Sequence, residues 1–74
     1  MHRVGTVERV AQGLAVARTT DEDPPGVGDE VVDESLDVVG RVVSVFGPVD
    51  HPYVAVSPEG RDPAALFGEP LYAR

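Results

Sequence analysis

The chain contains no cysteine, lysine, isoleucine or asparagine. Without cysteine it has neither disulfides nor thiolate metal sites. Without lysine it lacks the Gly-x-x-x-x-Gly-Lys loop that cradles phosphates, and no serine lies in a Gly-x-Ser-x-Gly elbow. No apolar run approaches the roughly 18 residues of a membrane-spanning helix, and no signal-type apolar core follows Met1-His2-Arg3. We therefore expect a soluble, cytoplasmic protein that is not an enzyme and does not associate with membranes.

The charge of the chain is strongly one-sided. Thirteen acidic residues face six basic ones, all of them arginine, which gives a net charge of −7. Two explanations fit this composition: a GC-rich genome, and adaptation to concentrated salt, where an acidic surface stays hydrated. We favour both together, which predicts a halophilic protein. Because an acidic surface repels phosphate, we do not expect the chain to bind RNA independently.

Carboxylates gather between positions 21 and 34, in a run at Asp21-Glu22-Asp23 and then at Asp29, Glu30, Asp33 and Glu34. They lack the ligand spacing of a calcium loop and its closing bidentate glutamate. His2 and His51 are the only histidines, and no third ligand accompanies them. We interpret the acids as a solvated surface, and we expect neither a metal ion nor a cofactor.

Short valine-rich segments separated by Gly and Pro make up most of the chain. Such segments favour strands, here 4–10, 14–18, 29–33, 38–46, 53–56 and a closing edge strand at 70–73. Residues 19–28 are expected to form a loop, and Ser57 to begin a turn. Asp62 as N-cap, Pro63 at the first position and Gly68 as the stop predict one helical turn over 63–67. This pattern predicts a single all-β domain over residues 1–74, a small antiparallel barrel of six strands.

The segment from Val38 to Ser57, VVGRVVSVFGPVDHPYVAVS, joins two of these strands through a turn that carries Gly47, Pro48 and Pro52. Gly47 can adopt a positive φ, while Pro48 fixes its own φ and donates no N–H. The turn is therefore expected to be stiff. A stiff and partly apolar loop loses little entropy when a partner binds it.

The aromatic and apolar residues around the turn, and Arg41 before it, each have a structural and a functional interpretation. An aromatic residue at a strand end usually anchors the core, so we expect Phe46 to be buried with Tyr53 covering it. For Pro48, Val49 and Tyr53, partner contact and a simple turn are equal alternatives, because apolar residues at a stiff turn are hard to bury in so small a barrel. Arg41 interrupts a valine strand, so a bulge or a solvated stem is expected, with a partner carboxylate as the alternative. The candidate partner-binding residues are Phe46, Gly47, Pro48, Val49, Pro52, Tyr53 and Arg41.

The combination Gly-x-Val…Phe-Gly-Pro-Val-x-x-Pro-Tyr-Val, from Gly40 to Val54, closely resembles the motif of the GAR subunit of H/ACA small ribonucleoproteins. Those particles are RNA-guided pseudouridine synthases. The resemblance begins at Val4-Gly5-Thr6-Val7 and extends to Gly68-Glu69-Pro70-Leu71-Tyr72. It implies the six-stranded barrel of a translation-factor domain, in the bare archaeal form of the subunit without Gly-Arg-rich tails.

The resemblance also implies a function. The chain would dock, as a non-catalytic subunit, on a pseudouridine synthase of the TruB and dyskerin type, and would meet the guide RNA only indirectly. By acting on a mobile substrate-gripping loop it would assist substrate loading and product release in rRNA pseudouridylation. Two other classes are retained. A self-associating PRC-type barrel would form a homodimer, where the subunit is expected to be a free monomer, and a ribosome-associated RNA-processing barrel would bind bare RNA.

Overall fold

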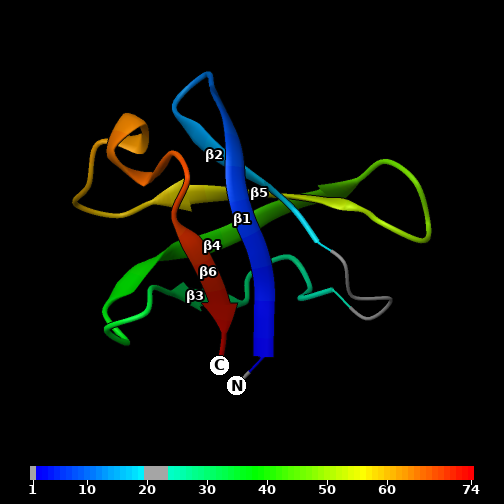
Figure 1. Ribbon diagram of the computed structural model, residues 1–74, viewed down its shortest axis with the longest axis horizontal. Coiled ribbons are helices and arrows are strands. Elements are labelled where there is room, and N and C mark those ends of the chain that lie inside the picture. Colours follow the sequence, from blue (N-terminus) through cyan, green and yellow to red (C-terminus); the bar gives the residue numbers. More distant parts are fainter. Residues whose placement is uncertain (1, 20–23) are drawn as a thin grey trace.

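The computed structural model describes residues 2–19 and 24–74 and folds them into six strands and one short 3₁₀ helix (Figure 1). In chain order these are β1 (His2–Ala11), β2 (Leu14–Arg18), β3 (Glu30–Val32), β4 (Val38–Phe46), β5 (Tyr53–Pro58), η1 (Pro63–Leu66) and β6 (Pro70–Ala73). All strand pairs are antiparallel, and the order β1-β2-β5-β4-β3-β6 closes into a barrel. The prediction of a small six-stranded antiparallel barrel with one helical turn is confirmed.

The predicted loop at 19–28 connects β2 to β3. Residues 20–23, which include the acidic run Asp21-Glu22-Asp23, lie outside the described residues. Further along the loop, the Gly26 N–H donates to the Asp29 carboxylate at 2.8 Å, and the Asp29 N–H donates to the Gly26 carbonyl at 3.0 Å. Within the described ranges, no helix has the length and apolar character needed to span a bilayer.

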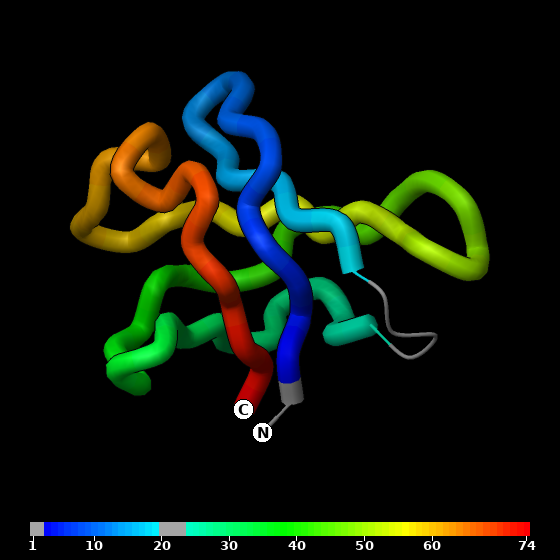
Figure 2. Tube along the Cα trace, in the orientation of Figure 1, coloured from blue at the N-terminus to red at the C-terminus, as the bar shows by residue number. Residues whose placement is uncertain are grey.

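Strand β6 closes the barrel and lies beside the first described residues of β1 (Figure 2). It pairs with β1, where His2 is opposite Ala73, and with β3, where Val31 is also opposite Ala73. The expectation that β6 is an edge strand is therefore wrong, because it is paired on both sides. Proline is tolerated in β6 because Pro70 is the first residue of the strand, a position where proline is accepted even without an edge.

Valine fills most of the barrel interior. Alternate residues of a strand face opposite sides, so one set of positions from each strand points inward. Valine suits a narrow interior because its branched side chain has few rotamers to lose. The core cluster consists of Val4, Val7, Ala15, Ala17, Val31, Val39, Val42, Val54, Val56, Leu66, Leu71 and Ala73.

Two buried glycines allow strands to cross at close range. A Cβ at Gly5 in β1 would overlap the carbonyl oxygen of Arg18, and a Cβ at Gly40 in β4 would overlap that of Ser57. Gly5 has a φ of 153°, and the register of β1 against β6 shifts between Arg3 and Gly5. Both close approaches therefore occur at a residue without a Cβ.

Some element boundaries differ from the predicted ones. Strand β5 continues two residues past its predicted end, because Ser57 pairs with Arg41 and Pro58 pairs with Gly40. The predicted turn at Ser57 is therefore wrong and begins after Pro58. Proline is tolerated there because β2 pairs with β5 only as far as Val56, so Pro58 lies at an unpaired edge on that side. Strand β1 is longer than predicted because its first residues pair with β6, a partner that is distant in sequence.

The short helix η1 closely follows its predicted signals. The Asp62 side chain accepts a hydrogen bond from the Ala64 N–H at 3.0 Å, and Pro63 is the first helical residue. The helix ends at Leu66, one residue earlier than predicted, and Gly68 follows with a φ of 82°. Leu66 is 3% exposed and packs into the core cluster, so η1 contributes to the barrel interior.

Candidate protein-interaction site

The outer ends of β4 and β5, with their connecting turn, form an arm over residues 43–53 that projects from the barrel (Figures 1 and 2). Strand β3 pairs with β4 only as far as Arg41, so β5 is the one strand that pairs with β4 in the arm, among the described residues. Phe46 and Tyr53 are Cα partners at the base of the turn. Their rings stack, with centroids 5.6 Å apart and an interplanar angle of 23°. This stacking rigidifies the arm at the point where it turns.

Gly47 is required in this turn for two reasons. Its φ is 95°, as the sequence predicts, a value that side chains other than hydrogen tolerate poorly. A Cβ there would also lie 2.9 Å from Cδ2 of Tyr53. The glycine therefore allows the backbone to turn directly over the edge of the tyrosine ring.

Phe46 is not in the core, and the expectation of a buried anchor is wrong. Its side chain is 47% exposed. A bulge between Val42 and Ser44 adds one residue to β4 and reverses the inward and outward positions beyond it. Val45 then packs against the core and Phe46 faces outward. The other part of the prediction is confirmed, because Tyr53 packs against the Phe46 ring.

The turn itself exposes some of its candidate residues and hides one. Gly47, Pro48 and Val49 are exposed, and Val49 is 89% exposed at the tip. Pro52 is buried, and its carbonyl accepts a hydrogen bond from the Thr19 N–H at 3.0 Å. Pro52 therefore fastens the arm to the end of β2, and its side chain does not form part of the exposed surface.

Arg41 lies on the barrel rather than on the arm. It is exposed in β4, as the solvated interpretation predicts, between the buried Gly40 and Val42. Its guanidinium donates to the Gly28 carbonyl at 3.1 Å and lies 4.0 Å from the Glu30 carboxylate. Arg41 is thus engaged with the loop before β3, and the structure does not bring it together with the aromatic pair.

Two rows of residues across β1, β2, β5 and β4 face outward beside the arm. The register gives one row as Arg9, Val16, Ala55 and Ser44, and the other as Thr6, Arg18, Tyr53 and Phe46. The row between them, Val7, Ala17, Val54 and Val45, faces the core. Val16 and Ala55 are nevertheless only 8% and 3% exposed. Neighbouring side chains on the outer face therefore cover these two residues.

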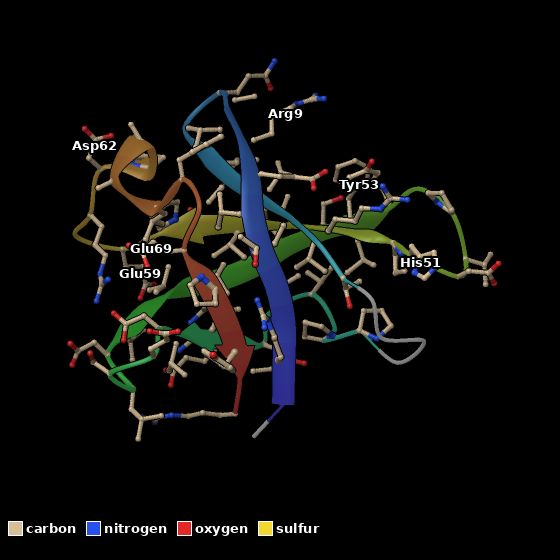
Figure 3. The ribbon with its side chains drawn as sticks, in the orientation of Figure 1. Arg9, His51, Tyr53, Glu59, Asp62 and Glu69 are labelled. Atoms are coloured by element: carbon tan, nitrogen blue, oxygen red, sulfur yellow. The ribbon has the colours of Figure 1, made fainter. Side chains whose placement is uncertain are left out.

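A hollow of about 150 Å³ opens on this outer face, lined by Glu8, Arg9, Val16, Phe46 and Tyr53. Figure 3 shows Arg9 and Tyr53 on the same side of the molecule. The guanidinium of Arg18 lies 5.7 Å from the centroid of the Tyr53 ring, within the range of a cation–π contact. The hollow therefore combines an apolar floor and aromatic wall with arginine nearby.

Asp33 lines a recess together with Asp62 and Glu69, which Figure 3 shows on the other side of the barrel from Tyr53. Its carboxylate accepts hydrogen bonds from Arg61 at 2.9 Å, from the Ser35 N–H at 2.8 Å and from the Asp37 N–H at 3.1 Å. Burial raises the pKa of this carboxyl, but the hydrogen bonds and the charge of Arg61 outweigh it. The pKa of Asp33 therefore lies below its ordinary value of 3.8.

Acidification is expected to weaken the fold through Asp33. The pKa of Asp33 is lower in the folded chain than in the unfolded one, so its ionised form stabilises the fold. This contribution to the free energy of unfolding is complete above the unfolded pKa. It is lost as the pH falls through the folded pKa, which lies below 3.8. The urea midpoint of the wild type should exceed that of Asp33→Asn at pH 7, and the difference should shrink toward pH 2. Glu34→Gln, which removes an adjacent exposed carboxylate, is the control. A constant difference between wild type and Asp33→Asn would contradict this assignment.

No group of three or more His, Cys, Asp or Glu side chains is placed to hold a metal ion within 2–19 and 24–74. The residues that the structure adds to the predicted site are Glu8, Arg9, Val16 and Arg18. Neither arginine stands out in the sequence, because both occupy ordinary outward strand positions. Only the strand pairings could have identified them: β2 with β5 sets Arg18 opposite Tyr53, and β1 with β2 sets Arg9 opposite Val16.

No protein-family model and no curated protein matches this sequence. Among solved structures, the structure of the Gar1 domain of NAf1 superposes with a TM-score of 0.75. The superposition covers 99% of this chain and 82% of that one, at 12% sequence identity. At this identity the similarity is one of architecture: the chain has the fold of a Gar1 domain over essentially its whole length.

Proposed function

We propose that this protein is a non-catalytic subunit of an H/ACA ribonucleoprotein, which docks on the pseudouridine synthase subunit and assists substrate loading and product release. The observation that carries the proposal is the position of the Phe46-Gly47-Pro48-Val49 motif. This motif carries the sequence resemblance to the GAR subunit, and it lies at the exposed end of the arm. The Gar1-domain fold supports the same family of functions independently of the motif.

The exposure of Val49 is better explained by a partner than by folding. A valine that is 89% exposed contributes almost nothing to the core. The stacked rings and the buried Pro52 nevertheless hold the turn in one conformation. A preorganised apolar tip loses little conformational entropy on binding, which favours a role as a docking element.

The test combines binding with turnover. The chain is mixed with the TruB- or dyskerin-type synthase of the same organism, and the complex is isolated by size exclusion with light scattering. We expect a free monomer that forms a stoichiometric complex with the synthase. Added to the guide-RNA particle, it should raise the steady-state rate of pseudouridine formation and leave the first turnover nearly unchanged, because loading and release limit repeated cycles.

Other results would favour the alternative classes. A stable homodimer without affinity for the synthase would support a PRC-type barrel. Tight binding of bare RNA at the working salt concentration would support an RNA-processing barrel, because phosphate contacts weaken steeply as salt rises.

A further inference from the structure

Two arginines beside the hollow have no acidic partner in the described parts of the chain. Their guanidinium groups, on Arg9 and Arg18, make no ion pair there, although the chain has more than twice as many acids as arginines. The remaining arginines bond to groups of the chain itself: Arg3 to Thr6, Arg41 to Gly28, Arg61 to Asp33 and Arg74 to Glu30. A shortage of carboxylates therefore does not explain why these two are unpaired.

Both arginines flank the same apolar surface. Arg9 lines the hollow directly, and Arg18 lies over the Tyr53 ring that forms its wall. Arginine stacked on an aromatic ring keeps its N–H groups available at the ring edge, where they can bind a carboxylate with two parallel bonds. The surface thus offers an apolar recess bordered by two positive charges and by the single carboxylate of Glu8.

The size of the hollow limits what it can hold. Pockets for small molecules and cofactors have about 300–1,000 Å³, well above the 150 Å³ found here. The hollow instead suits a single apolar side chain of the kind that anchors protein interfaces.

We propose that the hollow receives one apolar side chain from an acidic segment of the partner protein, and that carboxylates flanking this anchor pair with Arg9 and Arg18. The inference rests on the proposed function and specifies the chemistry of the synthase surface that the arm meets. Arginine beside aromatic rings would also suit a single-stranded nucleic acid. A protein segment is favoured because Val16 and the two aromatic rings line a recess for an apolar side chain, which no nucleotide carries. A protein segment can also limit its carboxylates to those that face the two arginines, whereas every nucleotide brings a phosphate toward Glu8 and a chain of net charge −7.

The test measures the affinity of the cognate synthase for the full chain and three variants by titration calorimetry. Arg9→Gln/Arg18→Gln keeps the long polar stems and removes both charges. Arg74→Gln, at an exposed arginine that pairs with Glu30 and does not line the hollow, removes one charge as a control. Arg9→Glu/Arg18→Glu reverses both charges. We expect binding at least about tenfold weaker for the Gln pair, weaker still for the Glu pair, and a change of less than about twofold for Arg74→Gln.

The possible outcomes separate the inference from the proposed function. Wild-type binding that the Gln pair leaves unchanged, or that the Glu pair strengthens, would overturn the acidic-segment inference while leaving synthase docking intact. Absence of wild-type binding would overturn both. A fluorescent single-stranded RNA that binds the wild type and is lost in the Gln pair would assign the arginines to nucleic acid and overturn the inference. Circular dichroism confirms that each variant is folded.

Discussion

Gly40→Ala is expected to remove about 3 kcal/mol or more of the stability of the chain, a large part of the total. The new Cβ would overlap the carbonyl oxygen of Ser57 and lie 2.8 Å from its carbonyl carbon, both of which are backbone atoms that no side-chain rotation can move away. Strands β4 and β5 would have to separate where Gly40 pairs with Pro58. Overpacking of this kind, together with lost ladder hydrogen bonds, costs about 3 kcal/mol or more. A chain of 74 residues has only about 4–11 kcal/mol of stability.

Gly60→Ala is the matched control for this prediction. Gly60 has a φ of 71°, so alanine is strained there, but no atom lies within 4 Å of the added Cβ. The expected loss is about 1 kcal/mol, from backbone conformation alone. Urea unfolding followed by circular dichroism compares the two variants with the wild type. Equal midpoints for Gly40→Ala and Gly60→Ala would show that the close strand crossing does not limit stability.

Val49→Asp is expected to weaken binding to the synthase about 100-fold, or about 3 kcal/mol, without loss of stability. Val49 is 89% exposed, so the free chain can solvate an aspartate there at little cost. In the complex the same carboxylate would be removed from water without a partner, which is costly. Val49→Thr separates the two effects, because it keeps the shape and adds a hydroxyl without a charge. Its loss of affinity should be much smaller.

Phe67→Asp controls for the general effect of an acidic substitution at an exposed apolar residue. Phe67 is 64% exposed after η1, at the opposite end of the barrel from the arm. The affinity of the Phe67→Asp variant for the synthase should match that of the wild type, as measured by calorimetry with both proteins purified. Equal affinities for Val49→Asp and Phe67→Asp would remove Val49 from the interface. Tyr53→Ala is less informative, because Tyr53 also packs against Phe46, Arg18 and Gly47.

The candidate site illustrates where sequence reasoning succeeds and where it fails. The positive φ of Gly47 was predictable because a local turn has local causes, and the capping of η1 by Asp62 was predictable in the same way. The position of Phe46 was not, because a single extra residue at the bulge reverses every later side chain in β4. The hollow was also inaccessible to sequence analysis, since its lining comes from four strands whose register is set by pairing.

The amino-acid sequence alone determined the class of the fold, the approximate position of each strand and the stiff turn between β4 and β5. These properties depend on valine-rich alternation and on Gly and Pro, whose effects act within a few residues. The tertiary structure alone decided that β6 is paired on both sides, that Phe46 faces outward and that Arg9 and Arg18 border one hollow. Those features depend on the register between strands that are distant in sequence, and register is fixed only when the whole barrel closes.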